Sequence, residues 1–129
     1  GTEMILVVED EAPVRRIVAR TLAASGYRVL VAEDGEDALE LERSYEGHID
    51  LVLTDVVMPG MGGRQVADAI RIRRPGVGIL FMSGYTDDEV VRHGVLALED
   101  ALLQKPFTPP LLLRKVREVL DAKASSRRN

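Results

Sequence analysis

The ten residues LVLTDVVMPG, from Leu51 to Gly60, decide the fold. A short, continuous apolar run such as LVL is typical of a parallel β-strand that is covered on both faces. The run stops at an acid, Asp55, and a Pro-Gly turn signal follows shortly after it. Because a carboxylate at the end of a buried strand loses hydration, it needs compensating groups nearby. The stretch therefore predicts a central strand that ends in a functional acid.

The same alternation of short apolar runs and helical periods continues in both directions from this stretch. Each run is followed by residues at helical spacing, with start signals such as Asp34 and Thr108. The helix after Gly63 is expected to turn Val66, Ala69 and Ile70 inward. The five predicted strands are Met4–Val8, Arg28–Ala32, Ile49–Thr54, Val77–Met82 and Ala101–Gln104. Five βα units in succession predict a parallel sheet with helices on both faces.

Composition narrows the class of protein. A chain of 129 residues with 46% hydrophobic residues suits one domain, which we place at residues 4–122 with flexible ends at 1–3 and 123–129. The net charge of -4 gives no support for direct nucleic-acid binding. Because there is no Cys, the sequence excludes disulfides and thiolate metal sites. No apolar run is long enough to span a bilayer, so we expect no membrane contact and a cytoplasmic location.

Acids gather where two of the predicted strands end. Glu9, Asp10 and Glu11 follow the first strand and Asp55 ends the third. The carboxyl ends of parallel strands meet at one edge of the sheet, where ligands bind. Carboxylates packed together repel one another, and oxygen-only ligation points to Mg²⁺, with Mn²⁺ as an alternative. We assign Glu9, Asp10 and Asp55 to this metal site, and Glu11 to capping the first helix.

A lysine and a hydroxyl reach the same edge. Lys105 ends the fifth strand and Ser83 follows the fourth. The ammonium of Lys105 can span about 6 Å to Asp55, neutralise it in one state and hold a phosphate oxygen in another. Ser83 can donate to the same oxygen. This set suits phosphoryl transfer onto the Asp55 carboxylate as the nucleophile.

The sequence resembles the receiver domains of two-component response regulators. Four motifs, in family order and spacing, carry the resemblance over roughly Met4 to Leu120: ILVVEDE, LVLTDVVMPGMGG, FMSGYT and LLQKPF. The resemblance implies a flavodoxin-like (βα)5 three-layer sandwich with strand order 2-1-3-4-5. It also implies phosphorylation of Asp55 by a histidine kinase or a histidine phosphotransfer domain. In the match, Glu9 and Asp10 take the Mg²⁺-binding acid positions, the backbone carbonyl of Val57 the third ligand position, Ser83 the hydroxyl and Lys105 the lysine, with a cis bond to Pro106.

Two departures from the family pattern affect the predicted switch. Glu9 stands where Asp is commoner, and its longer side chain is expected to bind metal less directly. Leu102 replaces the usual aromatic residue of the fifth strand, so Tyr85 and the loop after Ser83 are expected to take over part of the switching. Val57 and Tyr85 flank the site and neither offers an acid or amide to orient water. The sequence therefore predicts slow self-dephosphorylation.

The predicted function is that of a signalling phospho-acceptor rather than a turnover enzyme. The motifs look most like receivers at the carboxyl end of hybrid histidine kinases, which would make this domain the cytoplasmic portion of a membrane sensor kinase. A stand-alone cytoplasmic regulator is the other context. A homodimer on activation is an expectation for the face of the fourth helix and fifth strand. Three alternatives are weaker: a Mg²⁺-dependent Rossmannoid phosphohydrolase, which lacks its first-strand Asp-x-Asp pattern here; an FMN-binding flavodoxin, which needs a phosphate-cradling loop in place of these acids; and an inactive scaffold.

Overall fold

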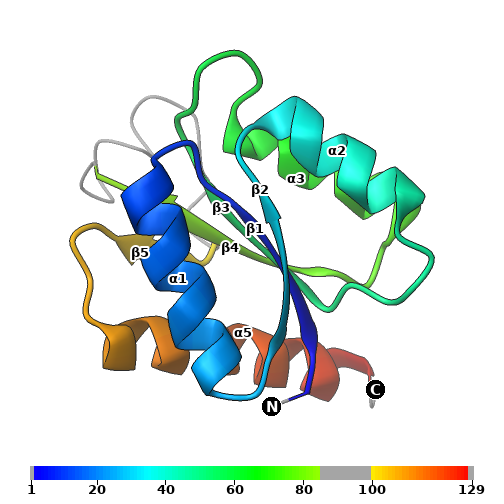
Figure 1. Ribbon diagram of the computed structural model, residues 1–129. Coiled ribbons are helices and arrows are strands. Elements are labelled where there is room, and N and C mark those ends of the chain that lie inside the picture. Colours follow the sequence, from blue (N-terminus) through cyan, green and yellow to red (C-terminus); the bar gives the residue numbers. More distant parts are fainter. Residues whose placement is uncertain (1, 85–99, 128–129) are drawn as a thin grey trace.

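Five parallel strands form one sheet in the computed structural model, which describes residues 2–84 and 100–127. The strand order is β2-β1-β3-β4-β5, as the family resemblance implied. This order places β3 at the centre between β1 and β4, and the carboxyl ends of the parallel strands lie at one common edge (Figure 1). The strands are β1 (Met4–Val8), β2 (Arg28–Ala32), β3 (Leu51–Asp55), β4 (Gly78–Ser83) and β5 (Leu102–Gln104).

Helices cover both faces of this sheet and complete the flavodoxin-like three-layer sandwich (Figure 1). On one face lie α1 (Ala12–Ala24) and α5 (Pro109–Arg127), and on the other lie α2 (Gly35–Ser44) and α3 (Gly63–Arg73). The helix starts follow the sequence signals. Asp34, for example, caps α2 by accepting a hydrogen bond from the backbone N–H of Asp37 at 2.8 Å.

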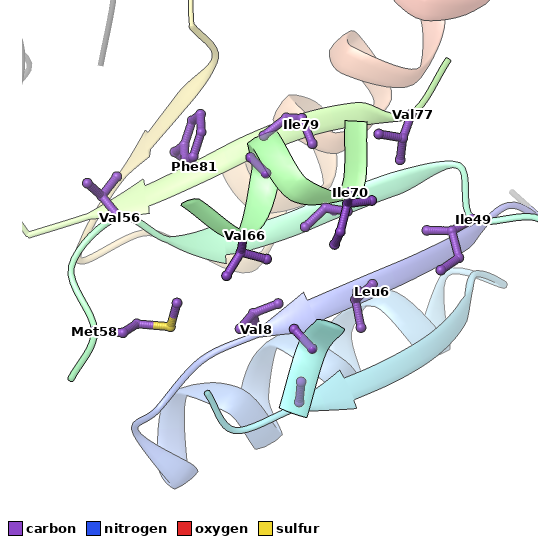
Figure 2. Packing of buried hydrophobic residues seen from close by; sticks show 14 of the residues in the cluster. Leu6, Val8, Ile49, Val56, Met58, Val66, Ile70, Val77, Ile79 and Phe81 are labelled. Atoms are coloured by element: carbon purple, nitrogen blue, oxygen red, sulfur yellow. The ribbon is translucent and has the colours of Figure 1, made fainter. Parts of the chain in front are cut away.

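Alternate residues of the central strands build two separate cores. Leu6 and Val8 of β1 point toward α3, where Val66 and Ile70 meet them (Figure 2). Ile5 and the other residues of opposite parity pack under α1 and α5. Since both faces are covered, β1, β3 and β4 are buried along their whole length, which explains their continuous apolar runs. This rigid centre holds the carboxyl edge in place.

The structure differs from the sequence predictions at a few boundaries. α3 buries Ala67 together with Val66 and Ile70, while Ala69 is only half-buried, because the helix phase is set by packing on the sheet. α5 continues past the predicted boundary at residue 122, and the ammonium of Lys123 lies 3.7 Å from the carboxylate of Asp50. The helix that the βα alternation predicts between the fourth and fifth strands, from Thr86 to about His93, lies outside the described residues.

Candidate functional site

The predicted site residues converge at the carboxyl edge of the sheet. A pocket of about 250 Å³ opens there between the β1–α1 turn and the ends of β3, β4 and β5. Glu9 is fully buried beside it, behind Asp10 and Asp55. The pocket is lined by Asp10, Glu11, Asp55, Val57, Met82, Ser83, Gly84 and Lys105. Residues from four separate segments of the chain thus share one small, polar hollow.

Lys105 is the electrostatic centre of this pocket. Its Nζ lies 2.7 Å from Oδ1 of Asp55 and 2.7 Å from Oε1 of Glu9. The ammonium therefore reaches Asp55 across the sheet edge, as the sequence predicted. Burial lowers the pKa of Lys105, but its hydrogen bonds to Asp55 and Glu9 outweigh burial, and the net pKa lies above the ordinary value. Lys105 consequently stays protonated and charged.

Glu11 does more than the capping role assigned to it. It stands at the N-cap position of α1, but its side chain makes no capping hydrogen bond to the helix. Its Oε1 lies 3.7 Å from Nζ of Lys105 instead. A carboxylate at the N-terminus of a helix is drawn to the nearest cation as well as to the helix dipole. Glu11 thus adds a further negative charge at the rim of the pocket.

Backbone hydrogen bonds fix the segments that carry these side chains. The N–H of Lys105 donates to the carbonyl of Ser83 at 2.7 Å, which ties the end of β5 to the end of β4. The N–H of Val56 donates to the carbonyl of Met82 at 2.9 Å and ties the end of β3 to β4. The Lys105–Pro106 peptide bond is cis, as the family resemblance implied. The distances within the site therefore depend on paired strands rather than on free loops.

The acids of the pocket form a tight group. Carboxylate oxygens of Glu9, Asp10 and Asp55, one from each, all lie within 4.8 Å of one another. Burial, and next the neighbouring Glu9, raise the pKa of Asp55 to about 8, against the opposing effect of Lys105. Burial and Glu9 likewise raise the pKa of Asp10. For Glu9, burial raises the pKa, but hydrogen bonding with Asp55 and Lys105 prevails and lowers it overall.

One oxygen of Asp55 supports a cation site. Oδ2 of Asp55 is buried, and within the described ranges it has no hydrogen-bond partner. An unpartnered buried acceptor is costly, and the single ammonium of Lys105 cannot neutralise three acids. A hard divalent cation with oxygen ligands compensates both deficits. The donor set of Glu9, Asp10 and Asp55 thus fits Mg²⁺, in agreement with the sequence prediction.

Gly63 is a residue of the site that the sequence reasoning did not single out. It begins α3, and its N–H donates to the carbonyl of Val56 at 2.9 Å. A Cβ atom at this position would collide with the backbone carbonyl of Asp55. Only glycine allows α3 to pass so close to the acid-bearing strand. The Gly62–Gly63 pair in the motif LVLTDVVMPGMGG was the available signal for this close approach.

Three of the predicted residues have different outcomes. Val57 lies at the mouth of the pocket, with 58% of its surface exposed. Leu102 lies outside the pocket: it pairs with Phe81 in the sheet and packs, partly buried, against the core under α2 and α3. Tyr85 lies outside the described residues. The site itself is therefore assembled from Glu9, Asp10, Asp55, Val57, Ser83 and Lys105.

A second, apolar pocket adjoins the first. It has a volume of about 460 Å³ and lies between α1 and the loop that leads from β5 to α5. Lys105 lines both pockets, so the apolar pocket and the acidic one share this side chain. Ile17, which lines the apolar pocket, is 58% exposed. The lining residues are Val14, Ile17, Val18, Lys105, Pro106 and Phe107.

Comparisons with known proteins agree with this geometry. Residues 5–117 match the response regulator receiver domain. The chain is 36% identical over 121 residues to the sensor kinase CckA of Brucella abortus, and the match covers 94% of this chain. It spans only 13% of that kinase, and between 30% and 52% of seven further curated relatives.

Solved structures support the same assignment. The receiver domain of the hybrid histidine kinase CckA is 37% identical, with a TM-score of 0.76 and coverage of 91% of this chain and 98% of that one. The response regulator TrrA of Thermotoga maritima, solved in complex with Mg²⁺-BeF, is 32% identical, with a TM-score of 0.78 and coverage of 92% and 99%. Within the described residues, no helix is long and apolar enough to cross a membrane. The chain belongs to the response regulator receiver domains, the phospho-acceptor modules of two-component signalling.

Proposed function

We propose that Asp55 is the phospho-acceptor of this receiver domain and that it takes a phosphoryl group from a phosphohistidine. The observation that carries the proposal is the environment of Asp55. Its Oδ1 is held by Lys105 at 2.7 Å, while its buried Oδ2 has no hydrogen-bond partner within residues 2–84 and 100–127. A carboxylate that is aligned by a cation on one oxygen and unpartnered on the other is suited to act as a nucleophile.

The transfer is a displacement at phosphorus. A carboxylate oxygen of Asp55 forms the new P–O bond as the P–N bond to the donor imidazole breaks. The bonding electron pair stays on the imidazole nitrogen, which then takes a proton from solvent. Lys105 and Ser83 bind the transferring oxygens and stabilise the charge that develops on them. Replacing an electrostatic group of this kind typically costs about 10²- to 10³-fold in rate.

Mg²⁺ is part of the proposal. Glu9, Asp10, Asp55 and the backbone carbonyl of Val57 would hold it, and when bound it supplies positive charge against the phosphoryl oxygens. The support is the acid group within 4.8 Å and the Mg²⁺-BeF complex of the related TrrA. Asp10 and Val57 both line the pocket. Manganese would serve in the same way, because it also prefers oxygen ligands.

Modification of the protein by a small phosphodonor tests the acceptor role. The parent protein and an Asp55→Asn variant are incubated with Mg²⁺ and acetyl phosphate, or with beryllium fluoride, and intact mass or ligand uptake is measured. We expect modification of the parent only, and none when EDTA removes the metal. Equal modification of the Asn variant would show that the acceptor is another residue. Steady release of phosphate from small phosphoesters would favour the weaker phosphohydrolase alternative.

The apolar pocket beside α1 suggests where the phosphohistidine donor docks. It shares Lys105 with the acidic pocket, and Lys105 contacts Asp55, so a domain seated on it would lie next to the acceptor acid. We propose that Ile17 and Phe107 contact the donor, a histidine kinase or a phosphotransfer domain. An Ile17→Glu variant should lose transfer from a phosphorylated kinase core, for example that of CckA, and keep modification by acetyl phosphate. Loss of both would instead indicate damage to Asp55.

The context and lifetime of the signal are also proposals. The identity to CckA supports a receiver within a hybrid histidine kinase. The open reading frame that encodes this sequence tests this: a kinase region in the same frame supports the hybrid kinase, and its absence supports a stand-alone regulator. The exposed, apolar Val57 offers no group that orients water, which supports slow self-dephosphorylation. A Val57→Asn and Tyr85→Glu variant should lose its phosphoryl group faster.

We further propose that phosphorylation acts through Ser83, the loop after it and the β5 face, and that this face forms a homodimer on activation.

A further inference from the structure

Both carboxylate oxygens of Glu9 contact donor groups of the protein. Oε1 lies 2.7 Å from Nζ of Lys105, and Oε2 accepts a hydrogen bond from the backbone N–H of Glu11 at 3.0 Å. The Glu9 side chain is fully buried. Asp55 differs in this respect, since among the described residues only its Oδ1 has a donor. Of these two acids, Glu9 is thus the one whose oxygens are already engaged.

The backbone of Glu9 is fixed, so the reach of its carboxylate is set by the length of the side chain. Its N–H donates to the carbonyl of Ala32 at 3.1 Å. Its carbonyl accepts from the guanidinium of Arg15 at 2.8 Å, and Arg15 itself is held on α1. An Asp at this position would be shorter by one carbon–carbon bond of about 1.5 Å. A carboxylate retracted by that length cannot keep both the Lys105 and the Glu11 contact.

Lys105 has two competing demands on it. It lies at the same distance, 2.7 Å, from Glu9 and from Asp55. Its charge is thus divided between the acid that is proposed to react and an acid that is not. Any cation that enters the pocket competes with Lys105 for the Glu9 carboxylate, because a charge-assisted contact at this distance in a buried setting is strong.

We infer that Glu9 is a positioning residue that clamps Lys105, and that this clamp weakens the affinity of the site for Mg²⁺ by keeping the Glu9 carboxylate on the lysine. The inference rests on the proposed function for the place of the metal. It adds a specific role for the extra methylene of Glu9: the side chain holds Lys105 next to Asp55, and this lowers the affinity for the cation. A shorter acid should release Lys105 and raise that affinity.

A double-mutant cycle tests the clamp. The dissociation constant for Mg²⁺ is measured by titration calorimetry on the parent, Glu9→Asp, Lys105→Met and the double variant. We expect Glu9→Asp to tighten Mg²⁺ binding about 3- to 10-fold when Lys105 is present, the range expected for releasing one partly shielded charged contact. With Met at 105, the same change should leave the constant within about two-fold, the residual scatter of independent effects.

Several outcomes would overturn the inference. Equal tightening in both backgrounds would mean that the shorter acid acts on the metal directly and not through Lys105. Weaker binding by Glu9→Asp would contradict the clamp outright. A metal-independent readout is the amide proton resonance of Glu11, because this N–H donates to Oε2 of Glu9. The resonance should shift strongly upfield in Glu9→Asp, where the hydrogen bond is lost, and little in Lys105→Met. An unchanged Glu11 resonance in Glu9→Asp would also overturn the clamp.

The outcome for the proposed function is judged separately. Beryllium fluoride uptake and acetyl phosphate modification of the parent report on Asp55 and not on the clamp. If the parent binds Mg²⁺ and the cycle shows coupling, but no modification occurs, the proposed acceptor role is wrong and the clamp stands. If modification requires Mg²⁺ but the cycle shows no coupling, the acceptor role stands and the clamp is wrong. A parent that binds no Mg²⁺ at millimolar concentration overturns the clamp and the metal site together.

Discussion

At the amino edge of the sheet, the described acids Glu3 and Asp50 are each matched with donors. Glu3 accepts from Arg117 at 2.8 Å, and Asp50 accepts from the N–H of Met4 at 2.9 Å. Asp50 also lies 3.1 Å from Nε2 of His48 and 3.7 Å from the ammonium of Lys123. These contacts hold the ends of the chain against the sheet. They leave little negative charge that a ligand would be needed to neutralise.

At the carboxyl edge, the acids outnumber the cation that serves them. In the described part of the chain, Lys105 is the one cation that contacts the carboxylates of Glu9 and Asp55, with Glu11 3.7 Å away, and Oδ2 of Asp55 has no partner. The same residue types therefore stabilise the fold at the amino edge and leave uncompensated negative charge at the carboxyl edge. The difference teaches that function is marked by an unbalanced group of charges, not by charges as such.

The largest expected effect is on the rate of phosphoryl transfer. Lys105→Met removes the cation that binds Asp55 and the transferring oxygens, so we expect modification by acetyl phosphate to slow about 10²-fold. Lys123→Met, which removes a cation at the amino edge, should leave the rate within about two-fold, since Lys123 neighbours Asp50 and not the pocket. Initial rates of mass gain measure both. Equal losses would contradict the division between the two edges, and circular dichroism checks that both variants fold.

Next comes the steric contrast between two glycines. Gly63→Ala places a Cβ against the backbone carbonyl of Asp55, which cannot yield without moving β3, so we expect the free energy of unfolding to fall by about 1–3 kcal/mol. Gly78→Ala at the amino end of β4 meets mainly the side-chain tips of Leu51 and Val119 at 3.1 Å. These tips can rotate, and the change should stay within about 1 kcal/mol. Urea unfolding measures both, and a larger loss for Gly78→Ala would refute the argument.

The sequence allowed the prediction of the sheet and of most site residues because both follow from strand ends. Continuous apolar runs identify buried strands, and parallel strands must bring Asp55, Ser83 and Lys105 to one edge. Strand order and the cis bond before Pro106 came from the family resemblance and are confirmed. Features that depend on a short run of residues, or on a family motif, could thus be predicted from the sequence.

Contacts between segments that are distant in the chain could not be predicted from the sequence. The close approach of Gly63 to Asp55 depends on how α3 crosses the sheet, and the contact of Glu11 with Lys105 joins residues from opposite ends of the chain. Arg74 was not noticed either. Its guanidinium donates to the carbonyls of Glu42, Tyr45 and Gly47 and so closes the end of α2. No local pattern reports on such a contact, because its geometry exists only after the helices have packed.

Neutralising one acid at each edge should change stability in opposite directions. The pKa of Asp55 is raised to about 8, so folding binds a proton and stability falls as pH rises from about 4 to 8. In EDTA at pH 8, Asp55→Asn should therefore raise the free energy of unfolding by about 1–3 kcal/mol, with little effect near pH 4. Asp50→Asn should lower it by about 0.5–1 kcal/mol through loss of its ion pairs. Changes of the same sign in urea unfolding would contradict the comparison.

The smallest effect belongs to the pair of Glu3 and Arg117 at the amino edge. The hydrogen bond from Arg117 lowers the pKa of Glu3 below 4.5, so the contribution of this pair is present above the unfolded-state pKa and is lost as pH falls through the lowered value. Because the Arg117 side chain is 41% exposed, solvent screens the pair, and Arg117→Gln should cost only about 0.5 kcal/mol at pH 7.

The pH profile of that cost separates the two edges more sharply than its size does. For Arg117→Gln, the difference from the parent in urea unfolding should be constant above pH 5 and shrink below pH 4, whereas the effect of Asp55→Asn grows up to pH 8. Lys115→Gln is the matched control, since Lys115 lies 3.9 Å from the exposed Glu118 on the same helix and should cost nothing measurable. A cost for Arg117→Gln that grows toward pH 8 would mean that acids at the amino edge, too, are left without sufficient positive charge.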